Sequence, residues 1–413
     1  MALVLPFKAI RPQREYAAQV AALPYDVMTR EEAQKAVAGK DFSFMHVEKS
    51  EIDVPDSTRS DDELIYRTAK SNFARMREKG IVSQEKFPCF YIYRQQMGSQ
   101  VQTGIVGVMS AAEYDAGKIK KHELTRKDKE EDRIRHVDMV NAQTGPVFTS
   151  YMARPRINAI VKKIVAGNPE YNFTAEDGII HTAWVVADAG QIEQIKKEFL
   201  QVDALYIADG HHRAAAAAAV ARKRRKLDNA TGSINEADMV LAVLFPHDQL
   251  KVMDYNRAVK DLNGLTPEKY LEKITSCFTV NKNFAAKSPQ KLHDFGMYLG
   301  GRWYKLTIKD GIYDVKDPVA NLDAAILQDH LLAPVLGITD PRTDDRIKFI
   351  GGIRGMAELE KLVDKDGFAV AFSLYPTTME QIMRVANAGA IMPPKSTWFE
   401  PKLRSGMFVH DLS

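Results

Sequence analysis

The segment from residue 204 to residue 226 constrains the fold of this 413-residue chain more than any other. It begins with the short apolar run Ala204–Ala208, which is typical of a buried strand. Asp209 and Gly210 then predict a tight turn, and a helix is expected over His211–Lys226. Six consecutive alanines give that helix a high intrinsic propensity and a thin profile, which allows close packing against a sheet. We therefore expect a strand, a turn and a helix in a fold that contains a sheet.

The turn has the chemistry of an anion site. A helix that begins at His211 presents unpaired amides and a partial positive charge, and Gly210 lets the backbone approach a ligand closely. Arg213 offers a planar fork to phosphate oxygens. A role in helix capping accounts for Asp209 alone, whereas His211, His212 and Arg213 add donors that capping does not need. The sequence therefore predicts a phosphate-binding turn at these five residues.

Composition indicates a folded protein of two or three domains without a dominant electric field. Hydrophobic residues make up 45% of the chain and charged residues 27%. A net charge of +3, from 57 basic and 54 acidic residues, draws the whole molecule to neither nucleic acid nor membrane. Cys89 and Cys277 supply too few thiolates for a structural zinc site and fit a reducing cytosol. With no signal peptide and no apolar run of about 20 residues, we expect a cytoplasmic enzyme.

Periodicity predicts further helices and strands along the chain. Thr29 and Glu32 form a capping box before the first helix. Helices are expected over Arg30–Ala38, Ser60–Lys79, Gly190–Leu200 and Leu322–Leu336, and strands over Phe87–Arg94, Val101–Ser110, Trp184–Ala187, Met239–Phe245, Leu250–Tyr255 and the hairpin Met297–Ile308. The fold class is therefore α+β.

A second candidate is the pair His122 and Glu123, which lies in the highly charged stretch Lys118–Arg135. This stretch is too polar to form core, so we expect it on the surface. Because position 126 is Arg126, the pair does not complete the helix of a zinc protease. Taken alone, it is typical of a solvated face.

Several motifs together resemble the DUF1015 family and, through it, the ParB/sulfiredoxin-like free-serine kinases. They are Pro6-Phe7-Lys8-Ala9 with Arg11-Pro12, Pro24-Tyr25-Asp26-Val27, His122-Glu123 with Thr125, Asp209-Gly210-His211-His212-Arg213, and Met392-Pro393-Pro394-Lys395-Ser396-Thr397. The resemblance implies a ParB/sulfiredoxin-like mixed-sheet core at residues 116–262, which carries both candidate motifs. Additional α+β regions are then expected at residues 1–115 and 263–413.

The resemblance also implies roles. Glu123 accepts the proton of a serine hydroxyl as general base, with His122 and Asp209 as further catalytic candidates, and Asp209–Arg213 hold the phosphates of ATP or ADP. Asp209 is expected to bind Mg²⁺, because this ion prefers carboxylates together with substrate phosphates and water. The implied substrate is free serine or a similar small hydroxyl compound. This requires Glu123 to lie near the start of the helix at His211, and a separation of some 15 Å or more would exclude the mechanism.

Other candidates and alternatives remain open. Lys348 and Arg354 flank a glycine-rich segment and Lys395 follows two prolines, so these three residues are secondary candidates for substrate binding. The basic cluster Arg222–Lys226 raises the alternative of a ParB-like, nucleotide-dependent DNA-binding regulator. Cations in the last turns of a helix also offset its dipole, so we expect no nucleic acid partner. A nucleotide or phosphoester hydrolase, with water as acceptor at the same turn, is a further alternative. The sequence does not determine the oligomeric state.

Overall fold

A computed structural model describes residues 2–227 and 234–413 of the chain. The chain divides into two compact units, one formed by residues up to Leu250 together with Pro401–Ser413 and the other by Lys251–Glu400. Both contain helices and sheets, so the predicted α+β class is confirmed. The expected division at residues 115 and 262 stays a prediction about domains, whereas the contacts within the chain place the first 250 residues in one unit.

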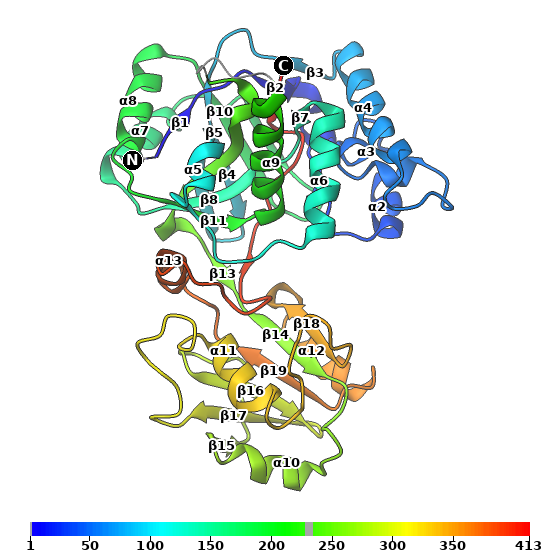
Figure 1. The fold of residues 1–413 in the computed structure, drawn as a ribbon, viewed down its shortest axis with the longest axis vertical. Coiled ribbons are helices and arrows are strands. Elements are labelled where there is room, and N and C mark those ends of the chain that lie inside the picture. Colours follow the sequence, from blue (N-terminus) through cyan, green and yellow to red (C-terminus); the bar gives the residue numbers. More distant parts are fainter. Residues whose placement is uncertain (1, 228–233) are drawn as a thin grey trace. The chain divides into compact units, whose positions relative to one another are not determined.

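A mixed sheet of nine strands, counted over the described residues, forms the centre of the first unit (Figure 1). In order across the sheet, its strands are β6 (Ile119–Lys120), β11 (Leu205–Asp209), β8 (Val147–Tyr151), β12 (Met239–Pro246), β5 (Gln100–Ser110), β4 (Phe90–Met97), β10 (Ile180–Val186) and β9 (Tyr171–Thr174), with β1 (Val4–Leu5) beside β5. β6 pairs in parallel with β11 and β8 with β12, and the other pairs are antiparallel. Every residue of β12 is buried, as expected for a strand covered on both faces.

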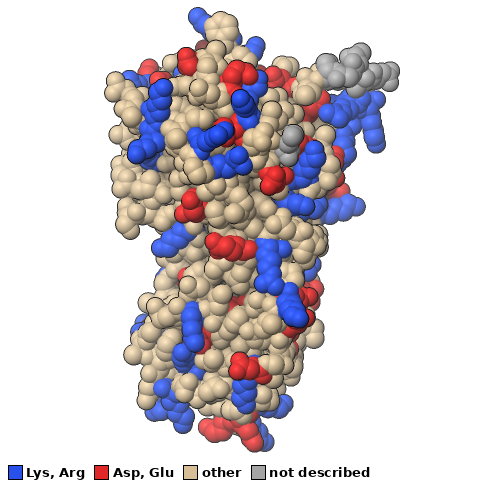
Figure 2. Space-filling model, turned by 90° about the vertical axis from the view of Figure 1, so that its left-hand side faces the viewer, with Lys and Arg blue, Asp and Glu red and all other residues tan. Residues whose placement is uncertain are grey.

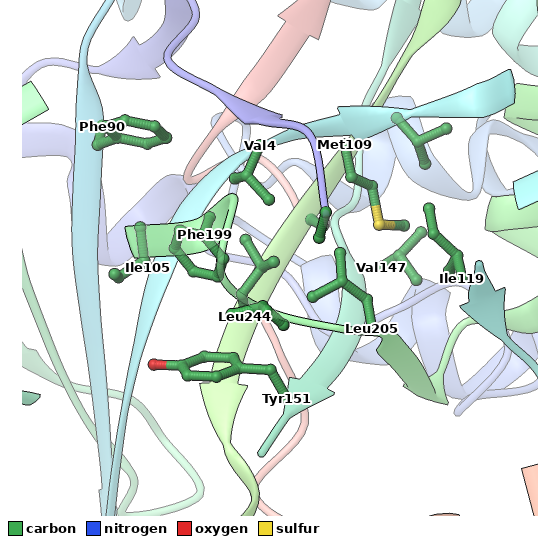
Figure 3. Close-up of a cluster of buried hydrophobic side chains, with 14 of the residues drawn as sticks. Val4, Phe90, Ile105, Met109, Ile119, Val147, Tyr151, Phe199, Leu205 and Leu244 are labelled. Carbon is green, nitrogen blue, oxygen red and sulfur yellow. The ribbon is translucent and has the colours of Figure 1, made fainter. Parts of the chain in front are cut away.

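Helices and sheet share one apolar core, part of which Figure 3 shows. The helices of this core are α5 (Ala111–Asp115), α7 (Pro155–Ile164), α8 (Ala189–Phe199) and α9 (His211–Leu227), and α6 (Lys127–Val140) packs on the outer side against α9. Figure 1 shows α5, α9 and α6 side by side, and α9 packs against both neighbours. Ala214, Ala217, Ala218 and Ala221 recur at helical spacing and lie in the core. The predicted thin helix packed on a sheet is therefore confirmed.

The opposite face of this sheet is covered by the C-terminal segment. Phe90 lies in the shared core, so its neighbour Tyr91 points to the other face of β4. There the ring centroid of Tyr91 lies 5.1 Å from that of Phe408. The segment after Pro401 is thus an integral part of the first unit.

A smaller sheet of the first unit joins the two ends of the chain. Its strands are, in order, β3 (Val82–Gln84), β2 (Ala9–Pro12), β21 (Val409–Asp411) and β7 (Ala142–Gln143). The helices beside it are α1 (Ala17–Val20), α2 (Arg30–Val37), α3 (Met45–Glu48) and α4 (Glu63–Glu78). Thr29 and Glu32 form the predicted capping box at the start of α2.

The second unit is built on its own antiparallel sheet. In order, its strands are β15 (Phe278–Lys282), β17 (Arg302–Ile308), β16 (Asp294–Leu299), β19 (Val370–Leu374), β14 (Tyr255–Val259) and β18 (Ile347–Gly351), and β13 (Val252–Met253) pairs separately with β20 (Trp398–Phe399). Its helices are α10 (Pro267–Ile274), α11 (Asp323–Leu327), α12 (Met356–Asp364) and α13 (Met379–Asn387), and a π-helical turn spans Gln328–Leu332. Among the described residues, short 3-10 turns lie at Arg14–Tyr16, Ser50–Asp53, Glu236–Asp238, His247–Gln249 and Gly352–Arg354.

Two predictions for the second unit need correction. The expected strand Leu250–Tyr255 is interrupted at Asp254, whose carbonyl accepts a hydrogen bond from the amide of Gly352. The expected helix Leu322–Leu336 widens into the π-helical turn and ends at Leu332. Among the described residues, no helix is both long and apolar enough to cross a membrane.

The alanine face of α9 yields a stability prediction. Replacing Ala217, which is 3% exposed in the core, with leucine should overpack the contact with the sheet and destabilise the protein by about 1–3 kcal/mol. Ala219→Leu is the matched control, because Ala219 is only partly buried. Urea unfolding of both variants measures the difference, and equal unfolding midpoints would contradict the close packing of this face.

Candidate active site

Parallel pairing of two short strands brings the two predicted motifs together. β6 pairs with β11, with Ile119 opposite Leu205. Because parallel strands run in the same direction, the segments that follow them emerge at the same edge of the sheet. Glu123 Oε2 consequently lies 3.9 Å from His211 Nδ1, where α9 begins. The predicted convergence of Glu123 on the start of this helix is confirmed, while the roles of the residues stay predictions.

Two buried histidines form the base of the site. The rings of His122 and His211 are only 2% and 6% exposed and meet edge to face, with centroids 4.6 Å apart. Burial lowers the pKa of His122 to about 4, although a hydrogen bond to the backbone of Ile207 opposes the shift. Burial, with a smaller contribution from His122, also holds the pKa of His211 well below its usual range. Both rings are therefore neutral at pH 7.

The prediction that Lys118–Arg135 lies on the surface is wrong for His122 and Arg133, which are buried. The stretch divides into β6, a loop and α6, and one face of α6 packs against α4 and α9. The guanidinium of Arg133 lies 4.0 Å from the ring centroid of Tyr25 and 2.8 Å from the carboxylate of Asp132. Pairing and stacking thus offset the cost of burying this charge.

The turn itself is held by an ion pair. Gly210 has a φ of +87°, a backbone conformation that is unfavourable for residues with a Cβ atom. Its amide donates to Asp209 Oδ1 at 2.9 Å. The other carboxylate oxygen, Oδ2, accepts from Lys402 Nζ at 3.0 Å. Burial alone would raise the pKa of Asp209, but the charges of Lys402 and Arg213 and the hydrogen bonds outweigh it and hold this pKa well below its usual range. Asp209 is therefore ionised, and both of its oxygens are engaged.

The next two motif residues contact the backbone of neighbouring segments. His212 Nε2 accepts from the amide of Arg126 at 3.1 Å, which fixes the ring at the start of α6. Arg213 Nη1 donates to the carbonyl of Pro146 at 2.6 Å. The Arg213 side chain also folds against Gly210, where an added Cβ would lie 3.3 Å from Nε. These contacts position the turn, and the predicted binding of phosphate by His212 and Arg213 stays a prediction.

The first unit also contains a cleft whose lining includes none of the motif residues His122, Glu123 and Asp209–Arg213. It has a volume of about 450 Å³, and Tyr25, Asp26, Glu48 and Arg133 are among its lining residues. Glu48 and Arg133 also line an adjoining cavity of about 20 Å³, large enough for one water molecule, which Arg213 borders. The buried Glu48 accepts from the hydroxyl of Thr144 at 2.6 Å. Glu48 and Arg133 thus separate the cleft from the small cavity at Arg213 and contact both.

Sequence reasoning missed two contributors to this region. Lys402 lies 193 positions after its partner Asp209, and no local pattern connects them. Tyr25 was part of a recognised motif, but its place over Arg133 depends on tertiary packing. The sequence did point to Tyr25, because Pro24-Tyr25-Asp26-Val27 is one of the motifs that resemble the DUF1015 family.

The secondary candidates lie in the second unit. Lys348 and Arg354 are exposed, on β18 and in the 3-10 turn that follows it. Lys395 is also exposed, and its carbonyl accepts from Arg257 Nη2 at 3.1 Å. Their predicted part in substrate binding stays a prediction.

The basic cluster at the end of α9 is paired with acidic side chains. Arg222 pairs with Asp115, Lys223 and Arg224 pair with Asp138, and Arg225 pairs with Asp238. Figure 2 shows basic and acidic side chains interspersed over much of the face drawn. Phosphates of DNA would have to compete with these carboxylates, which weakens the DNA-binding alternative.

The fold and the site define an α+β protein with a mixed sheet, in which a polar site lies where a strand turns into a helix. The chain belongs to the family described as "Protein of unknown function (DUF1015)", whose profile matches residues 4–325. The predicted membership is confirmed. No curated protein matches the chain.

Solved structures resemble the chain distantly. A free serine kinase in complex with AMP is 14% identical with a TM-score of 0.36, over 72% of this chain and 91% of that chain. SbnI with a C-terminal truncation, from Staphylococcus aureus, is 10% identical with a TM-score of 0.38, over 72% and 85%. A conserved hypothetical protein from Pyrococcus furiosus is 15% identical with a TM-score of 0.35, over 73% and 93%. Scores this low carry no argument about activity.

The ion pair at the turn predicts a pH-dependent loss of stability. Lys402→Met leaves the Asp209 carboxylate without its cation and should destabilise the protein by about 1–3 kcal/mol at pH 7. The native pair contributes fully above the ordinary aspartate pKa of about 3.9, because the folded pKa is lower. In the variant this folded pKa rises, so the penalty should shrink as the pH falls toward 4 and Asp209 becomes protonated.

Urea unfolding of both proteins at pH 7 and pH 4.5 measures this change. Lys86→Met, at an exposed position, is the matched control and should change the free energy of unfolding little at either pH. A penalty for Lys402→Met that is independent of pH would contradict the assigned pair.

Proposed function

We propose that this protein is a phosphotransferase that moves a phosphoryl group from ATP or ADP to the hydroxyl of free serine or a similar small compound. The observation that carries the proposal is the position of Glu123, whose carboxylate lies 3.9 Å from His211 Nδ1 at the start of α9. A proton acceptor thereby stands beside a helix N-terminus, which is a favourable place for a phosphate. The family resemblance, with its serine kinases, supports the same assignment.

Phosphoryl transfer chiefly requires alignment of donor and acceptor and neutralisation of the charge on the transferring group. The amides at the start of α9 and the ammonium of Lys402 supply positive potential around the turn. His211 is neutral, so its ring can donate a hydrogen bond without adding a charge, whereas the single ring proton of neutral His122 is directed to the backbone of Ile207.

Glu123 is the proposed general base. Its side chain is 44% exposed, so an acceptor hydroxyl can reach the carboxylate from solvent. The serine oxygen forms a bond to the terminal phosphorus of the nucleotide, the bond from that phosphorus to its bridging oxygen breaks, and Glu123 takes the hydroxyl proton. The products are O-phosphoserine and a nucleotide shorter by one phosphate.

Asp209 fits Mg²⁺ poorly while Lys402 is in place. Its oxygens already accept from Lys402 and from the amide of Gly210, so an ion there would lie close to the ammonium and the two positive charges would repel each other. Lys402 supplies the positive charge at this carboxylate, and no step of the proposed transfer depends on an ion at Asp209. Mg²⁺ is expected with the nucleotide, whose phosphates it prefers.

Hydrolysis is the second candidate, because water can also reach the exposed carboxylate of Glu123. Nucleotide consumption with and without serine separates the two activities, since a kinase shows little hydrolysis without its acceptor.

The cytoplasm is the proposed compartment, in keeping with free thiols at Cys89 and Cys277.

Glu123→Gln should abolish turnover and leave nucleotide binding largely intact, because the amide keeps the shape of the side chain but accepts no proton. Phosphoserine formation with ATP or ADP and Mg²⁺ measures turnover, and calorimetry measures nucleotide binding. Glu193→Gln, on the exposed face of α8, is the matched control and should retain activity. Undiminished turnover of Glu123→Gln, or no phosphoserine from the native protein with either donor, would contradict the proposal.

A further inference from the structure

The same corner of the first unit has the donor set of a metal site. One ligand atom each from His122, Glu123 and His211 lie within 4.8 Å of one another. Two imidazoles and one carboxylate suit Zn²⁺ and related divalent transition metals, whereas Mg²⁺ prefers oxygen ligands alone. The set therefore differs in chemistry from the predicted magnesium ligand Asp209.

The orientation of the rings supports this donor set. His122 hydrogen-bonds to the backbone carbonyl of Ile207, so one ring nitrogen carries the proton and the other presents a lone pair. A backbone carbonyl that fixes the tautomer in this way is a usual companion of a ligating histidine. The second ring, that of His211, is 6% exposed, and its Nδ1 is the nitrogen that lies beside Glu123 Oε2, so Nδ1 is the atom available to an ion shared with this carboxylate.

The donor atoms of Glu123 and His211 lie slightly farther apart than two ligands of a bound zinc ion would. Ligand atoms around a tetrahedral zinc ion lie about 3.3 Å apart, given metal–ligand distances near 2.0 Å. His211 Nδ1 and Glu123 Oε2 are 3.9 Å apart and belong to a buried ring and a half-exposed side chain. A rotation of the partly exposed Glu123 side chain can therefore shorten this one distance.

We propose that His122, Glu123 and His211 bind a divalent ion of the Zn²⁺ class, with the remaining coordination position open toward the start of α9. Three protein ligands and one open position are typical of zinc sites that bind a substrate or water. An oxygen of an anion held at the helix start is a suitable fourth ligand. The inference does not depend on the proposed phosphotransferase, and because a carboxylate bound to such an ion accepts protons poorly, an ion at this site would compete with the proposed role of Glu123 as general base.

Titration of the full chain with Co²⁺, without nucleotide or acceptor, tests the site. Co²⁺ replaces Zn²⁺ in such sites and reports imidazole ligation through its visible absorption. The native protein should bind one equivalent, and Glu123→Gln and His211→Gln should each weaken binding by at least about tenfold. His330→Gln, in the π-helical turn of the second unit, is the matched control and should bind as the native protein does.

The possible results of the Co²⁺ titration separate failure of the metal site from failure of the proposed kinase. Absent absorption, or equal binding by Glu123→Gln and the native protein, overturns the metal site, as does displacement of Co²⁺ by an equal concentration of Mg²⁺. Thermal unfolding without metal shows whether His211→Gln is folded, and Glu123→Gln decides alone if it is not, because this side chain is 44% exposed. Phosphoserine formation by a protein that binds no Co²⁺ refutes the metal site only, and Co²⁺ binding without phosphoserine refutes only the proposed kinase.

Discussion

The parallel pairing of β6 with β11 is the constraint on which the rest of the site depends. β6 is a strand of two residues, yet it fixes the register of the chain that leads to His122 and Glu123. At the other end of the charged loop, the bond from the Arg126 amide to His212 and the packing of α6 on α9 hold the chain beside the same helix start. A few main-chain hydrogen bonds at the edge of a sheet therefore bring together groups that are almost ninety positions apart.

Burial then decides the chemical character of what this pairing assembles. Histidines in water titrate near pH 6.5, but those at positions 122 and 211 are shielded from solvent and remain uncharged. The carboxylate of Asp209 is kept ionised by Lys402. The site thus combines neutral nitrogen donors, a fixed ion pair and the partly exposed Glu123, within a few residues of a helix terminus.

Local patterns predicted the parts of the molecule that local physics determines. The apolar strand, the turn at Gly210 and the alanine-rich helix were all expected, because propensity, turn chemistry and packing favour the same structure. The burial of His122 was not expected. A count of charges along the chain cannot show that one side chain of a polar stretch points inward. Lys402 was missed for a related reason, because ion pairs between distant segments leave no periodic trace.

The order of the segments along the chain determines when the first unit can complete its folding during synthesis. The first unit is interrupted after Leu250 by the whole of the second unit, and it is completed by Pro401–Ser413, which provides β21 and the cation of the turn. During synthesis, the large sheet emerges long before the strand that joins the small one. A nascent chain therefore leaves the place between β2 and β7 empty until Pro401–Ser413 has been synthesised, and the Asp209–Lys402 ion pair can form only then.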